Sequence, residues 1–104
     1  MKRGEVWWAD LPAPAGRRPV VLLSRDASYA VRTSITIAPV TRTVRGIPVE
    51  VPLGREDGLR AGSVVSLDDI TTIPKALVSR RVSALSPARM TEIEVAIRFA
   101  LDLG

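Results

Sequence analysis

Cysteine and histidine are both absent from this chain of 104 residues. Without cysteine there are no disulfide bonds, no thiolate nucleophile and no common structural zinc site, so an intracellular location is the simpler expectation. Without either residue, the chain has no obvious general base. Lysine is also scarce, since only Lys2 and Lys75 occur among 15 lysines and arginines. The net charge of +4 therefore rests on arginine, whose forked guanidinium suits phosphate groups.

Long apolar runs are missing as well. No stretch is long enough to span a bilayer, and the opening Met1-Lys2-Arg3-Gly4-Glu5 has no apolar signal-peptide core. We therefore expect a cytoplasmic protein without membrane contacts, folded as one domain over residues 1–104. Because 46% of the residues are hydrophobic, we expect a second copy to cover part of the surface, which makes the protein a homodimer.

The arginines are concentrated between residues 17 and 45. This stretch contains a single acid, Asp26, so it carries more positive charge than the whole chain. Each arginine taken alone could simply keep the surface soluble. Together, near the predicted strand ends, they favour a nucleic-acid partner. The six residues are Arg17, Arg18, Arg25, Arg32, Arg42 and Arg45.

Short apolar runs separated by turn residues predict a mainly β chain with a C-terminal helix. A polar loop at 25–34 has room for a helical turn, and Ile73-Pro74-Lys75 indicates a tight turn. Ser86 is a natural N-cap and Pro87 suits the first position of an amphipathic helix that continues to Gly104. The strand spacing indicates a small barrel. The expected strands are 5–11, 19–24, 35–40, 47–53, 62–67 and 78–85.

Two polar side chains stand at the ends of predicted strands. Arg18 precedes Pro19 at the start of the apolar run Val20-Val21-Leu22-Leu23, and Thr41 closes the strand predicted at 35–40. A guanidinium and a hydroxyl at two strand ends suit an anion, and a phosphate is the simplest choice.

Five segments resemble the MazF/PemK toxin family, in the same order and at similar spacing over nearly the whole chain. The resemblance implies an SH3-like barrel of the CcdB/PemK type that forms a homodimer. It also implies a toxin endoribonuclease that cleaves single-stranded mRNA without metal or other cofactor and is neutralised by a cognate antitoxin. The arginine-rich stretch predicts that this antitoxin uses an acidic, disordered segment. The segments are KRGEVWWADL (2–11), RPVVLLS (18–24), APVT (38–41), DDITTI (68–73) and the closing helix.

The resemblance assigns the family's catalytic residues to Arg18 and Thr41. The implied reaction is attack of a 2′-hydroxyl on the adjacent phosphorus, which leaves 2′,3′-cyclic phosphate and 5′-hydroxyl ends. Arg18 and Thr41 would stabilise the charge that grows on the phosphate oxygens. The proton of the 2′-hydroxyl passes to Arg18 itself, to Asp68 or to water, and the sequence leaves the three open. The expected substrate-binding residues, with no metal ligand among them, are Arg17, Ser24, Arg42, Arg45, Asp68 and Asp69.

Two segments depart from the family pattern. The loop Pro14-Ala15-Gly16-Arg17 is short and has no carboxylate, and the segment 68–73 replaces an amide by Asp69 and a cation by a hydroxyl. A different RNA preference is expected, and a degenerate toxin that cuts little is an alternative. Asp68 and Asp69 could instead only anchor the next turn. Another alternative is a non-catalytic SH3-like barrel that binds nucleic acid or a protein, as the CcdB toxins bind DNA gyrase.

Overall fold

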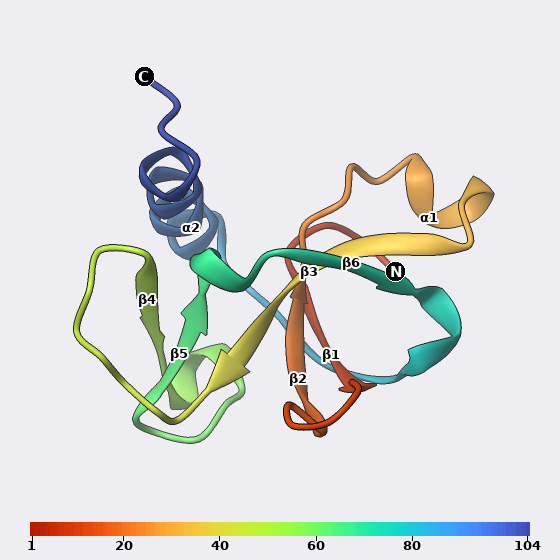
Figure 1. Ribbon diagram of the computed structural model, residues 1–104, viewed down its shortest axis with the longest axis horizontal. Helices are drawn as coiled ribbons and strands as arrows, with labels where there is room; N and C mark the ends of the chain where they lie inside the picture. The colour runs from red at the N-terminus through yellow and green to blue at the C-terminus, as the bar shows by residue number, and fades with distance from the viewer.

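The computed structural model describes all of residues 1–104 and contains a seven-stranded antiparallel sheet with two helices (Figure 1). Its strand order is β4-β5-β3-β2-β1-β7, and β6 pairs with β3. The strands are β1 (Glu5–Asp10), β2 (Arg17–Leu22), β3 (Ser34–Thr41), β4 (Glu50–Leu53), β5 (Ser63–Ser66), β6 (Thr71–Pro74) and β7 (Val78–Ala84). The helices are α1 (Ser28–Val31) and α2 (Pro87–Ala100), with short 3₁₀ turns at Arg55–Asp57, Leu67–Asp69 and Lys75–Leu77.

The long strand β3 connects the two parts of the sheet. One of its edges pairs with β2, with Val20 opposite Pro39. Its other edge pairs first with β6 and then, at Val40 and Thr41, with β5. The end strands β4 and β7 do not pair with each other. The predicted mainly β fold with a C-terminal helix is confirmed, and the strand ladder of the expected small barrel stays open between β4 and β7.

Both faces of the sheet are covered by apolar side chains. Successive residues of a strand point to opposite faces, so Val20 of β2 joins one buried cluster and Val21 joins the other. Ile93 of α2 packs in the cluster of Val21, and Tyr29 of α1 packs in the cluster of Val20. Each fully buried aliphatic side chain contributes about 1.5–3 kcal/mol. This two-sided burial explains why the run Val20-Val21-Leu22-Leu23, which begins within β2, is continuously apolar.

One strand was not predicted from the sequence. The segment before Pro74 was expected to lead into a tight turn, but Thr71–Pro74 forms β6 along β3, with Ile73 opposite Ile35. Ile73 is buried in this pairing. The free energy gained by burying Ile73 outweighs the turn preference of Pro74, which is the last residue of the strand. The strand expected at 47–53 starts later, because Glu50 N–H bonds back to the Ile47 carbonyl in a turn.

The C-terminal helix begins where the sequence predicts. The Ser86 hydroxyl accepts a hydrogen bond from Arg89 N–H (3.1 Å), and Pro87 occupies the first turn. The helix ends at Ala100, short of the expected Gly104. None of the helices combines the length and the apolar character needed to cross a membrane.

Candidate active site

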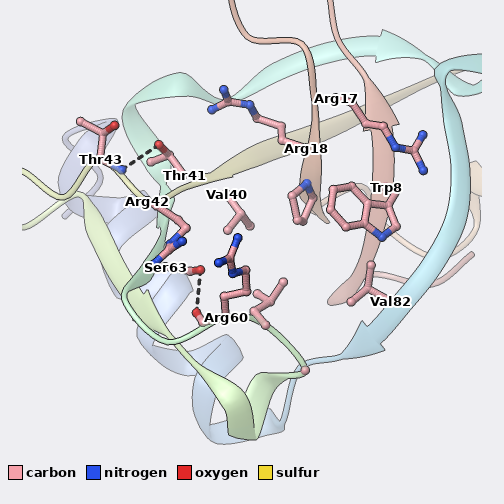
Figure 2. Close-up of a pocket in the computed structure, with 13 residues that line it drawn as sticks. Trp8, Arg17, Arg18, Val40, Thr41, Arg42, Thr43, Arg60, Ser63 and Val82 are labelled. Atoms are coloured by element: carbon pink, nitrogen blue, oxygen red, sulfur yellow. Dashed lines mark hydrogen bonds between the residues drawn. The ribbon is translucent and has the colours of Figure 1, made fainter.

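An open cavity of about 440 Å³, here called the central cavity, lies where β2 begins and β3 ends (Figure 2). Because the two strands are antiparallel, with Val20 opposite Pro39, the first residues of β2 and the last of β3 share one edge of the sheet. The loop after β4 forms one side of the cavity with residues 58–60. The lining residues are Trp8, Arg17, Arg18, Pro19, Val40, Thr41, Arg42, Thr43, Gly58, Leu59, Arg60, Ser63 and Val82.

Arg18 and Thr41 are each oriented by one hydrogen bond and keep free donors. The Arg18 Nε donates to the Ala15 carbonyl (2.9 Å), which leaves the terminal guanidinium nitrogens without a protein partner. The Thr41 Oγ1 accepts from Thr43 N–H (3.1 Å), so its own proton can be donated elsewhere. In Figure 2 the Arg18 guanidinium extends toward the side where Thr41 lies. The pair can therefore donate hydrogen bonds to one anion.

Arg17 stacks on Trp8 at the other side of the central cavity. The guanidinium carbon lies 5.2 Å from the centre of the indole ring, within the range of a cation–π contact. Arg17 Nη1 also donates to Asp10 (3.2 Å), so its charge is partly neutralised. Trp7 lies elsewhere, packed against the cluster around Val20. Trp8 thus belongs to the cavity, a position that its sequence neighbourhood did not indicate.

Arg60 also lines the cavity and was missed by sequence reasoning. It lies in the loop between β4 and β5, outside the arginine-rich stretch. The available signal was a cation between Gly58 and Gly62, on a loop that joins two predicted strands. Like Arg42, Arg60 is exposed and makes no ion pair with a carboxylate of the protein.

Arg45, another predicted substrate-binding residue, braces a turn and does not line the cavity. Its Nε lies 3.3 Å from Glu50 Oε2, and Arg45 and Gly46 donate backbone N–H groups to Glu50 Oε1, each at 2.9 Å. Burial raises the pKa of the Glu50 carboxyl, but these hydrogen bonds and the Arg45 charge outweigh burial and hold the pKa below its usual value. The turn therefore depends on an ionised Glu50.

The remaining predicted residues lie outside the central cavity. The Ser24 hydroxyl accepts from Thr36 N–H (2.8 Å) and links β2 to β3. Asp69 accepts from the Ser66 hydroxyl (2.8 Å) and lines a second cavity of about 460 Å³, which shares only Arg18 with the central one. Asp68 is exposed and lines neither cavity. The structure thus brings together Arg17, Arg18, Thr41 and Arg42, with Asp69 beyond Arg18.

No group of three or more acidic, histidine or cysteine side chains could hold a metal ion.

The sequence matches the PemK-like, MazF-like toxins of type II toxin–antitoxin systems over residues 2–101. The chain belongs to this family. The resemblance predicted from the five segments is therefore confirmed.

Relatives of known name agree with this assignment. "Probable endoribonuclease MazF5" of Mycobacterium tuberculosis is 41% identical over 101 residues, which cover 96% of this chain and 92% of the relative. "Endoribonuclease MazF3" of the same species is 40% identical over 86 residues, covering 83% of this chain and 84% of the relative. The endoribonuclease names favour the predicted enzyme over the non-catalytic alternative.

Solved structures give the same result. The "Mycobacterium tuberculosis toxin MazF-mt6" superposes with a TM-score of 0.89 at 36% identity, covering 96% of this chain and 98% of the other. An "Endoribonuclease in complex with its cognate antitoxin from Mycobacterial species" gives 0.90 at 30% identity, covering 100% and 97%. This chain therefore has the same overall fold as these two solved structures.

Proposed function

We propose that this toxin endoribonuclease cleaves single-stranded RNA in its central cavity, without a metal ion. The observation that carries the proposal is the juxtaposition of Arg18 and Thr41, both with free donors, at one edge of the sheet. Arg42 and Arg60 add unpaired positive charge to the same cavity. Such a cavity attracts a polyanion and offers donors for a single phosphate.

The proposed reaction is intramolecular. The RNA 2′-oxygen forms a bond to the adjacent phosphorus, the bond from phosphorus to the 5′-oxygen breaks, and 2′,3′-cyclic phosphate and 5′-hydroxyl ends remain. Negative charge grows on the phosphate oxygens, where Arg18 and Thr41 donate hydrogen bonds that strengthen in the transition state. Each such donor is worth about 10²–10³ in rate. Because Asp68 lines neither cavity and the free nitrogens of Arg18 serve as donors, we assign the 2′-hydroxyl proton to a water molecule. A proton from water completes the 5′-hydroxyl group as the 5′-oxygen leaves.

The test is incubation of the purified protein with long single-stranded RNA in EDTA, followed by analysis of the new ends. We expect 5′-hydroxyl and cyclic phosphate ends. Arg18→Ala should abolish cleavage while the circular dichroism spectrum shows that the fold is kept. Arg32→Ala, an exposed arginine outside the cavities, is the matched control and should cut at the wild-type rate. Absence of cleavage by folded wild-type protein in EDTA, or full activity of Arg18→Ala, would reject the proposal.

The proposed protein partners are a second copy and an antitoxin. A cytoplasmic location is also part of the proposal, because mRNA is the proposed substrate. Val95, Phe99, Leu101 and Leu103 are each more than half exposed at the C-terminal end of the chain, an apolar surface that a homodimer would cover. An acidic, disordered antitoxin segment should compete with RNA for the Arg18 site. Titration of the antitoxin into RNA-bound protein should release the RNA. Simultaneous binding with undiminished cleavage would exclude a shared site.

The two ligands should also differ in salt dependence. RNA binding should weaken with a log–log slope of about −0.7 for each phosphate contacted. Antitoxin binding should respond less steeply, since apolar contacts supply part of its affinity. Equal slopes for the two ligands would contradict this distinction.

A further inference from the structure

The arginines of this chain differ in whether the fold neutralises them. Five of them donate to carboxylates, namely Arg3, Arg17, Arg45, Arg81 and Arg89. Arg42, Arg55 and Arg60 have no such partner, and all three line an open cavity of about 440 Å³. We call this the side cavity. Its other lining residues are Gly58, Leu59 and Ala61.

The side cavity continues from the central cavity. The two share Arg42, Gly58, Leu59 and Arg60, so one extended ligand could occupy both. The cavity that contains Asp69 has a different character, since Arg18 is its only cation. Unpaired positive charge therefore extends from Arg18 toward Arg55, away from Asp69. A phosphodiester chain is attracted in that direction.

The loop that carries Arg55 and Arg60 is firmly anchored. Its buried Asp57 accepts from Gly54 N–H (2.9 Å) and from Arg89 of α2 at both carboxylate oxygens (3.0 and 3.2 Å). The Ser83 hydroxyl of β7 donates to the Asp57 carbonyl (2.6 Å). The two cations thus extend from a fixed backbone. A ligand need not order this loop when it binds, which favours affinity.

We propose that Arg42, Arg55 and Arg60 form a second phosphate subsite, which binds a backbone phosphate of the same RNA beyond the one that is cleaved. This inference rests on the proposed function. Three guanidinium forks around one open cavity match the several oxygens of a phosphodiester. An acidic protein segment has the same sign of charge, but continuity with the cavity of Arg18 and Thr41 favours the RNA strand. Substrates that end at the cleaved phosphate should therefore bind less tightly than longer ones.

The experiment is a phosphate scan. Oligoribonucleotides with one cleavage site receive a neutral methylphosphonate at one backbone position at a time, and affinity is measured with the attacking 2′-hydroxyl replaced by hydrogen. Wild-type protein should lose about tenfold in affinity at one or two positions distant from the cleaved phosphate. The double variant Arg55→Ala/Arg60→Ala should bind the unmodified RNA at least about tenfold more weakly than wild type. Its affinity should not change further when a methylphosphonate stands at those positions. Its log–log salt slope should be shallower by about 0.7 for each lost contact.

Two controls complete the design. Arg32→Ala/Arg98→Ala removes two exposed arginines that line none of the three cavities and should reproduce the wild-type scan. Arg55→Lys/Arg60→Lys keeps the charges and should restore most of the salt slope.

Three results would overturn the subsite. The double variant could retain the wild-type scan while the wild type cleaves RNA. The control Arg32→Ala/Arg98→Ala could lose as much affinity for RNA as Arg55→Ala/Arg60→Ala. Arg55→Ala/Arg60→Ala could bind RNA normally but lose its affinity for an acidic antitoxin peptide, which would assign the side cavity to the antitoxin. Wild-type protein that neither binds nor cuts RNA would instead refute the proposed function itself.

Discussion

Arg89 of α2 contacts three carboxylates at the base of the loop that carries Arg55 and Arg60. It donates to both oxygens of Asp57, to Glu92 (2.7 Å) and to Glu56 (3.0 Å). The hydrogen bonds to Asp57 and then to Glu92 raise the pKa of the Arg89 guanidinium above its usual range. The Asp57 side chain is 4% exposed and that of Arg89 20% exposed, so most of the ion pair is withdrawn from water.

The variant Arg89→Met should lower the free energy of unfolding by about 3 kcal/mol. It leaves the buried Asp57 carboxylate with one remaining hydrogen-bond donor, the backbone N–H of Gly54. Breaking a buried pair in this way costs about 3–5 kcal/mol, and we expect the lower value because Arg89 is still partly hydrated. In a domain of this size, the loss corresponds to a Tm lower by about 12 °C. The double variant Arg89→Met/Asp57→Asn keeps an acceptor for Gly54 without the buried charge and should recover most of the stability.

Urea unfolding and thermal melting, both followed by circular dichroism, provide the measurement. The control is Arg3→Met, which breaks the exposed ion pair with Glu94 (3.1 Å), whose side chains are 33% and 48% exposed. That variant should lose less than about 1 kcal/mol. A loss below about 1 kcal/mol in Arg89→Met, or a double variant no more stable than Arg89→Met, would refute the assignment of a buried charge pair.

Three further predictions concern positions away from Arg89. Ser24→Ala should cost about 1 kcal/mol in urea unfolding, because Thr36 N–H loses its acceptor, and should leave the cleavage rate unchanged; a large rate loss would restore Ser24 as a site residue. Gly58→Ala should cost about 1–3 kcal/mol and weaken RNA binding, because Gly58 has a φ of 78° and an added Cβ would lie 2.7 Å from the Ser83 Cβ. Glu50→Gln should flatten the pH dependence of stability: the lowered folded pKa stabilises wild type above the ordinary value near 4.5, and this advantage disappears as the pH falls through the folded pKa. Parallel pH curves for wild type and Glu50→Gln would contradict the last prediction.

The presence of Arg18 and Thr41 in one cavity could be predicted, because both lie at strand ends next to apolar runs. Once β2 and β3 pair antiparallel, the start of one and the end of the other must meet at the same edge. The strand β6 could not be predicted in this way. Its four residues include a proline and only one buried side chain, Ile73, so its existence depends on the partner strand β3. Local preferences in so short a segment are weaker than the pairing.

The charge of the central and side cavities is harder to predict, because it depends on which arginines the fold neutralises. Arg3 pairs with Glu94 across 91 residues, Arg81 with Glu5 across 76 and Arg89 with Asp57 across 32, so a count along the chain cannot find these pairs. The arginine-rich stretch contains Arg18 and Arg42, which line the central cavity without a carboxylate partner, but two of its other members, Arg17 and Arg45, are paired with acids. Arg55 and Arg60 lie outside the stretch, yet they remain unpaired beside the central cavity. The positive charge of these cavities therefore comes mainly from the cations without carboxylate partners, and these are identified only when the fold has assigned the carboxylates.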